Sequence, residues 1–147
     1  MSYLLDTCTI SKLRKLKKYP DKKLEKWVLS HNESTHFISV ITIGEIQAGI
    51  SKLDLKKPAE RQKRLLLEDW LFGELIPRFN DRTVTINAEV TVAWGKMYGE
   101  CQRRGVIVPV VDGLIAATAM VHNLTVVTEN VTDFLETGAR LLNPWAN

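Results

Sequence analysis

The sequence predicts an α/β fold, in which helices cover both faces of a central parallel sheet. Short apolar or β-branched runs alternate along the chain with longer segments of helical periodicity, and this alternation is typical of parallel sheets. The chain has 147 residues, 45% of them hydrophobic and 25% charged, which is the size and composition of one globular domain. No internal repeat, low-complexity segment or Gly/Ser linker divides it. We therefore expect a single domain over residues 1–147.

The first half of the chain is expected to contain two strands, each followed by helix. Apolar runs indicate the strands, and apolar residues at i, i+3 and i+4 indicate the helices. Pro20 separates two helical segments, because proline breaks a helix. In chain order, the expected elements are a strand at Tyr3–Leu5, a helix at 7–18, an amphipathic helix around Leu24, Trp27 and Val28, a strand at 36–40, and a helix with Ile43, Ile46 and Ile50 on one stripe.

The second half repeats the alternation. Pro58 lies near the start of a leucine-rich helix, a position that proline tolerates. Asn87 is a suitable N-cap, and Gly105 is a suitable end for the helix that Asn87 begins. In chain order, the expected elements are a helix from Pro58 to about Ile76 that ends before Pro77, a strand at 83–86, a helix from 87 to 104, an extended segment at 106–111, a helix at Val110–Val121, a strand at 125–128 and a strand at 140–142.

Acidic residues follow several of these strands. Asp6 directly follows the first strand, Glu45 lies on the helix after the second, Asp112 opens a helix after an extended segment, and Asp133 follows the strand at 125–128. Sites in parallel sheets form beyond the carboxyl ends of the strands, so we expect these four side chains to converge. Their repulsion would be relieved by a hard divalent cation, and Mg²⁺ prefers such oxygen ligands. A metal held there can activate water and stabilise charge on a phosphodiester.

Each acid also has a purely structural interpretation. An aspartate after a strand is often a helix cap, which applies to Asp6 and Asp112, and Asp133 is suited to a turn. Apolar surroundings favour a functional role for three of them, because an unused charge there is costly. Asp6 follows a strand expected to be buried, Asp112 is the lone charge in an apolar stretch, and Glu45 stands among isoleucines. For Asp133 both interpretations stay open.

Positive charge is concentrated in the first half of the chain. Residues 1–64 hold 14 Lys and Arg against 7 Asp and Glu, whereas residues 65–147 hold 6 against 10. The run from Lys12 to Lys26 is either a solvated helix face or a surface that attracts phosphate backbones. The three histidines, at 31, 36 and 122, are interpreted as surface or capping residues. The only cysteines, Cys8 and Cys101, make no disulfide framework or zinc motif, and no apolar stretch is long enough to span a membrane.

Four segments, taken together, resemble the motifs of the PIN-domain family, in particular the VapC toxins and their FitB-like relatives. The segments occur in the family's order and at similar separations over nearly the whole chain. They are Leu4-Leu5-Asp6-Thr7-Cys8, Ile41-Thr42-Ile43-Gly44-Glu45-Ile46, the run from Pro109 to Ala119 around Asp112, and the run from Thr128 to Phe134, with Leu141-Leu142-Asn143-Pro144 resembling the usual ending.

The resemblance implies roles for these residues. Asp6 and Asp112 would be the principal Mg²⁺ ligands, and Glu45 would bind the metal or orient the attacking water. VapC-type chains often carry asparagine at the position of Asn130 and the acid three residues later, so we expect Asp133 as the fourth acid and Asn130 as a neutral contributor. Thr7 and Thr128 are expected to support the site by hydrogen bonds. Glu129 departs from the pattern, since arginine is common there, and it either weakens phosphate contact or adds negative charge.

The resemblance also implies a function and partners. The chain would be the toxin of a type II toxin–antitoxin system, a cytoplasmic endoribonuclease that depends on Mg²⁺ or, since oxygen ligands accept both, Mn²⁺. Its expected partners are RNA, a cognate antitoxin and a second copy of the chain in a homodimer, with no membrane association. Residues 65–72 are more apolar than one helix stripe needs, which fits either a core helix or such an interface.

Two other functions compete with a nuclease. Asp6 after the first strand is also typical of phospho-acceptor proteins, but a haloacid-dehalogenase enzyme needs an aspartate where Cys8 stands. A response-regulator receiver needs paired acids after its first strand and a lysine near its last, and neither occurs. The second alternative is a PIN-like protein that binds RNA without cleaving it, which the full set of acids argues against.

Overall fold

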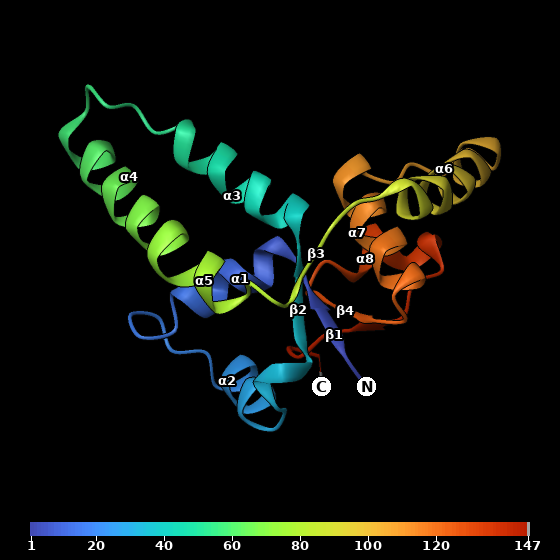
Figure 1. The fold of residues 1–147 in the computed structure, drawn as a ribbon, viewed down its shortest axis with the longest axis horizontal. Coiled ribbons are helices and arrows are strands. Elements are labelled where there is room, and N and C mark those ends of the chain that lie inside the picture. The colour runs from blue at the N-terminus through green and yellow to red at the C-terminus, as the bar shows by residue number, and fades with distance from the viewer. Residues whose placement is uncertain (147) are drawn as a thin grey trace.

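A parallel five-stranded sheet, with its strands in the order β3-β2-β1-β4-β5, lies at the centre of the fold (Figure 1). The structure is a computed structural model, and it describes residues 1–146. The strands are β1 (Tyr3–Leu5), β2 (His36–Ser39), β3 (Thr83–Val84), β4 (Thr125–Val127) and β5 (Leu141–Leu142). Every neighbouring pair is parallel, so the carboxyl ends of all five strands lie at one edge. The predicted α/β fold with a parallel sheet is confirmed.

Helices connect the strands and cover both faces of the sheet. Figure 1 shows α1 to α5 on one side of the sheet and α6 to α8 on the other. The longer helices are α1 (Thr7–Arg14), α2 (Lys22–Leu29), α3 (Val40–Ser51), α4 (Pro58–Trp70), α6 (Ala88–Arg103) and α7 (Val110–Val121). Short helical segments are η1 (Glu33–Thr35), η2 (Leu71–Leu75), α5 (Ile76–Arg78), α8 (Val131–Phe134) and η3 (Leu135–Thr137).

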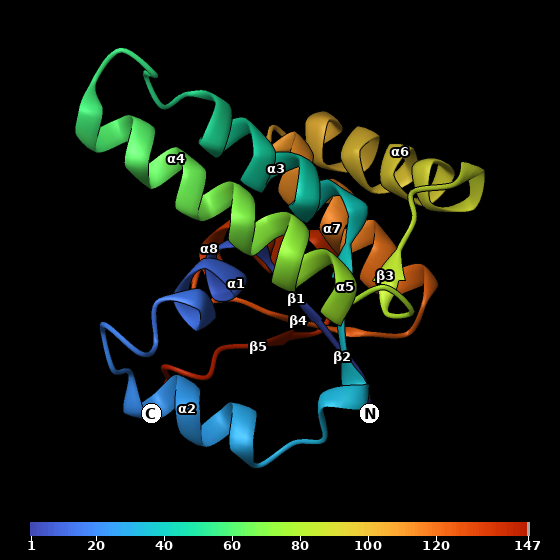
Figure 2. The same cartoon turned by 60° about the vertical axis from the view of Figure 1, so that its left-hand side comes forward.

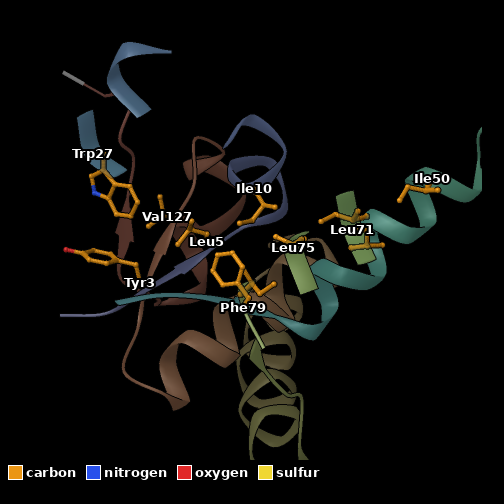
Figure 3. Packing of buried hydrophobic residues seen from close by; sticks show 11 residues of the cluster. Tyr3, Leu5, Ile10, Trp27, Ile50, Leu71, Leu75, Phe79 and Val127 are labelled. Carbon is orange, nitrogen blue, oxygen red and sulfur yellow. The ribbon is translucent and has the colours of Figure 1, made fainter. Parts of the chain in front are cut away.

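Each face of the sheet has its own hydrophobic core, because successive strand residues point to opposite faces. Tyr3 and Leu5 of β1 pack on the side of α1 to α5, and Leu4 packs against α7 and α8. Figure 3 shows the first core, in which Ile10, Leu75 and Phe79 lie beside Leu5. The strands are therefore buried on both sides, and polar groups that act on a ligand are confined to the sheet's edges and loops.

Two helices end elsewhere than predicted. Helix α1 ends at Arg14 rather than at 18, because Pro20 disfavours helical backbone just before it and the intervening lysines repel one another. Helical backbone continues from α4 through Pro77 to Arg78, past the predicted end. The segment η2, a π-helical turn, ends at Leu75, two residues before Pro77, and its wider turn accommodates the proline, which has no N–H to donate.

The interpretation of His36 as a surface or capping residue is wrong. Its side chain, at the start of β2, is buried, and its ring stacks on Trp27 with the ring centroids 5.0 Å apart. Burial lowers the pKa of His36, and the nearby cations His31, Arg82 and Arg78 lower it further, although Glu33 opposes them. Within residues 1–146, His36 Nε2 has no hydrogen-bond partner. His36 is therefore a neutral core residue.

The two cysteines differ in exposure. Cys8 is exposed, Cys101 is buried, and both are free thiols. Among the described helices, none combines the length and apolar character needed to cross a bilayer.

Candidate active site

In the structure, the four predicted acids lie on segments beyond the carboxyl ends of the strands. Asp6 directly follows β1, and Glu45 lies on α3, the helix after β2. Asp112 is in the first turn of α7, and Asp133 lies on α8, which follows β4. Asp6 is buried, Glu45 and Asp112 are half-buried, and Asp133 is exposed. The four carboxylates thus come from different elements and meet at the edge where sites of parallel sheets form.

Asp112 shows how closely these charges interact. Burial raises its pKa, and the charges of Asp133, Glu45 and Asp6 raise it further, to about 6. Like charges disfavour ionisation because each carboxylate repels the next. The charges of the other three predicted residues thus act on Asp112 in the same direction as its burial.

Asp6 is both a helix cap and a candidate ligand. Its Oδ1 accepts hydrogen bonds from the backbone N of Thr9 at 2.9 Å and from Thr9 Oγ1 at 2.7 Å, which caps α1. All the side-chain hydrogen bonds that Asp6 accepts within residues 1–146 go to Oδ1, which leaves Oδ2 for another ligand. The structural interpretation of Asp6 as a cap is confirmed, and it does not exclude the functional one.

Glu45 is held by Thr7, which also contacts Thr42. Thr7 Oγ1 donates a short hydrogen bond to Glu45 Oε1 and lies 3.2 Å from Thr42 Oγ1. Thr42 is fully buried on α3, one turn before Glu45. This chain of hydroxyls connects α1 to α3 and fixes one carboxylate oxygen of Glu45. The supporting role expected of Thr7 therefore has a direct geometric basis.

Asn130 and Asp133, the two residues considered for the fourth position of the site, make different contacts. Asp133 acts on Asp112 through its charge. Asn130 stands at the N-cap position of the short helix α8 without a capping side-chain hydrogen bond. Its Nδ2 donates to Cys8 Sγ at 3.4 Å, and its backbone N donates to Thr128 Oγ1. Asp133 thus brings negative charge to the site, whereas Asn130 ties the loop after β4 to α1.

Glu129, which departs from the family pattern, is neutralised by Lys12. Lys12 Nζ lies 2.8 Å from each carboxylate oxygen of Glu129 and 4.6 Å from the ring centroid of Trp145. Both side chains of the ion pair are more than a third exposed, so the pair contributes little to stability. Its effect is to cancel the extra negative charge beside the acids.

The four acids offer only oxygen donors to a metal ion. Within residues 1–146, no three His, Cys, Asp or Glu side chains are arranged to enclose a metal ion by themselves. Mg²⁺ commonly takes only one or two protein carboxylates and completes its shell with water and phosphate. An all-oxygen set around a carboxylate with a raised pKa therefore fits an open Mg²⁺ site rather than a closed cage.

The sequence placed Thr9 beside Asp6 only as part of a helix cap, and it gave no role to Thr42. Thr9 fixes Asp6, and Thr42 supports the bond between Thr7 and Glu45. The signal for Thr9 was present, since its position three residues after Asp6 is where an N-cap aspartate finds its partner. No local signal identifies Thr42, because its contact depends on how α1 packs on α3.

The fold and the edge carboxylates agree with a known class of protein. Residues 3–139 match the family model described as PIN domain. The chain belongs to the PIN-domain family.

Within this family, the chain is similar to VapC and FitB toxins over nearly its whole length. VapC ribonuclease Y4jK of Sinorhizobium fredii is 28% identical over 142 residues, 97% of this chain and 96% of that protein. Ribonuclease VapC2 of Rickettsia felis is 30% identical over 147 residues, 99% of this chain and 98% of that protein. The structure of FitAcB from Neisseria gonorrhoeae has a TM-score of 0.84 at 28% identity and covers 99% of both chains. The predicted resemblance is confirmed.

Proposed function

We propose that the chain is the toxin of a type II toxin–antitoxin system and acts in the cytoplasm as a Mg²⁺-dependent endoribonuclease. Relatives of similar length are named ribonucleases and toxins. The observation that carries the proposal is the environment of Asp112, whose pKa is raised to about 6 by burial and by Asp133, Glu45 and Asp6. Carboxylates gathered in this way can hold the divalent cation of a metal-dependent nuclease.

In this proposal, Asp6 and Asp112 are the principal metal ligands, Glu45 completes the site or orients the attacking water, and Asp133 is the fourth acid. A bound Mg²⁺ or Mn²⁺ supplies charge stabilisation and lowers the pKa of a coordinated water. Thr9 fixes Asp6 through Oδ1, and Thr7 fixes Glu45. These hydrogen bonds pre-orient two carboxylates before substrate binds, which lowers the entropic part of the barrier.

The histidines lie away from the acids. His31 and His36 contact Tyr3 at the start of β1, whereas the acids follow the ends of the strands. His122 is the C-cap of α7, ten residues or roughly 15 Å along the helix from Asp112. The chain thus offers no histidine to activate the RNA 2′-hydroxyl. The products should carry 5′-phosphate and 3′-hydroxyl ends.

The test is cleavage of labelled RNA by purified protein in EDTA, Mg²⁺ or Mn²⁺, with mapping of both new ends. Asp6→Asn and Asp112→Asn should each lower cleavage by more than about 100-fold, because changes outside the ligand shell already cost about 10–100-fold. Asp69→Asn, on the exposed surface of α4, is the matched control and should cleave normally. Full activity in EDTA, or cyclic-phosphate ends, would contradict the proposal.

RNA binding without cleavage is the second candidate function. It is favoured by one observation, namely that the described acids do not enclose a metal by themselves. Wild-type protein that binds RNA but leaves it intact in Mg²⁺ and Mn²⁺ would support this candidate.

The proposal includes an antitoxin and a homodimer as partners. Solved structures similar to the chain include FitAcB from Neisseria gonorrhoeae and VapBC2 from Rickettsia felis bound to a DNA fragment from its promoter. On the chain itself, Leu65, Leu66 and Phe72 are each more than half exposed on α4 and η2. Exposed apolar side chains in one region are typical of interfaces. Copurification with the protein encoded beside it, and light scattering of the chain alone, test the two partners separately.

A further inference from the structure

A groove between α1, α3 and α4 leads away from the candidate active site. Its volume is about 240 Å³, and Thr7 and Glu45 are among its lining residues. Figure 2 shows the three helices side by side, with α3 and α4 lying above α1. Thr7 begins α1 and Lys15, which also lines the groove, caps its end, so the groove follows α1 for about 12 Å.

Cations line this groove. Arg14 and Lys15 come from α1 and its C-cap, and Lys63 comes from α4. Lys15 and Lys63 are exposed, and neither forms an ion pair with another of residues 1–146. The Arg14 guanidinium lies 5.6 Å from the ring centroid of Trp70, which also lines the groove. Positive charge without a carboxylate partner favours an anionic ligand.

The rest of the lining is largely apolar. The lining also includes Ile46 and Ile50 of α3 and Leu67 and Trp70 of α4. A groove that combines apolar and aromatic side chains with cations matches single-stranded nucleic acid, whose bases stack on aromatic rings and whose phosphates contact lysine and arginine.

We infer that this groove binds the RNA strand on one side of the scissile phosphate, with Lys15 and Lys63 contacting successive phosphates. The inference rests on the proposed nuclease function and adds the path of the substrate. A polyanion fits the whole groove. One phosphate would lie beside the carboxylates and the metal that they would hold, and the neighbouring phosphates of the same strand would neutralise Lys15 and Lys63. The apolar lining, Trp70 included, then faces the bases.

The lysines between Lys12 and Lys26, which form one basic run in the sequence, lie in different places in the structure. Lys12 is paired with Glu129, and Lys15 lines the groove. Lys22 and Lys26 lie on α2, which Figure 2 shows on the opposite side of α1 from α3 and α4. Lys22 and Lys26, which carry the same charge as Lys15 and Lys63 but lie outside the groove lining, therefore provide a matched control.

The experiment compares the double variant Lys15→Gln/Lys63→Gln with the control Lys22→Gln/Lys26→Gln and the wild type. Binding of a short fluorescein-labelled single-stranded RNA is followed by anisotropy in EDTA, and its cleavage is measured separately in Mg²⁺. Each single-strand phosphate contact contributes about 0.7 to the salt slope, so the groove variant should lose about 1.4 from it. Between about 50 and 200 mM salt, wild-type affinity should then fall about sevenfold more than that of the groove variant. The control should keep the wild-type slope.

The outcomes separate the groove from the proposed function. If the wild type cleaves RNA but the groove variant keeps its full salt slope, the groove inference is wrong and the nuclease proposal stands. Equal losses in both double variants would also overturn it, since a diffuse basic surface would then bind RNA. If the groove variant binds RNA normally but loses a copurifying antitoxin, the groove binds protein instead. If the wild type neither binds nor cleaves RNA, the proposed function itself fails.

Discussion

Replacing Asp112 by asparagine removes a carboxylate whose charged form is unfavourable in the folded chain. The rise in pKa from 3.8 to about 6 corresponds to about 3 kcal/mol at 1.36 kcal/mol per pKa unit. Because Asp112 is only half-buried and solvent screens its neighbours, we discount this to about 1 kcal/mol. No hydrogen bond contributes to the shift, so asparagine loses no such contact. In metal-free buffer, Asp112→Asn should therefore be the more stable protein by about 1 kcal/mol, or about 2–4 °C in Tm.

The sign of this effect depends on pH. The folded pKa of Asp112 lies above its unfolded value, so the cost is absent below pH 3.8, develops as the pH rises to about 6 and is complete above that. Urea unfolding in EDTA at several pH values across this range should show a gain that grows with pH and then levels off. The exposed Asp69→Asn variant should show no gain. Added Mg²⁺ should stabilise the wild type but not Asp112→Asn. A variant that is less stable than the wild type in EDTA, or a gain independent of pH, would refute the reasoning.

Three further changes address other parts of the molecule. Thr7→Val removes the hydrogen bond that holds Glu45 and should lower kcat about 10–100-fold with little change in KM or folding stability, while Thr7→Ser should restore kcat. Below about pH 6.5 the wild type should lose stability, because His36 binds a proton in the unfolded chain but not when it is buried in the folded chain. His36→Phe should abolish this loss, and urea unfolding of both proteins at acid pH checks it. Leu66→Glu, at a largely exposed position on α4, should weaken antitoxin binding or dimerisation while leaving Tm within about 1 °C, and unchanged assembly in light scattering and copurification would remove Leu66 from the interface.

The order of strands and helices was predictable from the sequence because its signals are local. The β-branched run that forms β4 and the N-cap Asn87 of α6 need only their neighbours in the chain to act. The ends of α1 and α5 were less predictable. The end of α1 depends on charge repulsion that competes with helical periodicity, and the passage through Pro77 depends on the π-helical turn η2.

The set of candidate acids was also determined by the sequence, since Asp6, Glu45 and Asp112 interrupt apolar stretches and follow strands or open helices at an expected edge. Their electrostatic coupling was not, because the pKa of Asp112 depends on its burial and on its distances from acids that other elements of the fold carry.

Tertiary packing alone decided two further features. It buried His36 against Trp27, although a histidine beside a predicted turn is usually exposed. It also placed Lys15 of the α1 C-cap and Lys63 of α4 along one groove that opens at Glu45. Local patterns specify which face of each helix is apolar, but the partner of that face, and hence which charges meet across a groove, follows only from how the helices pack together.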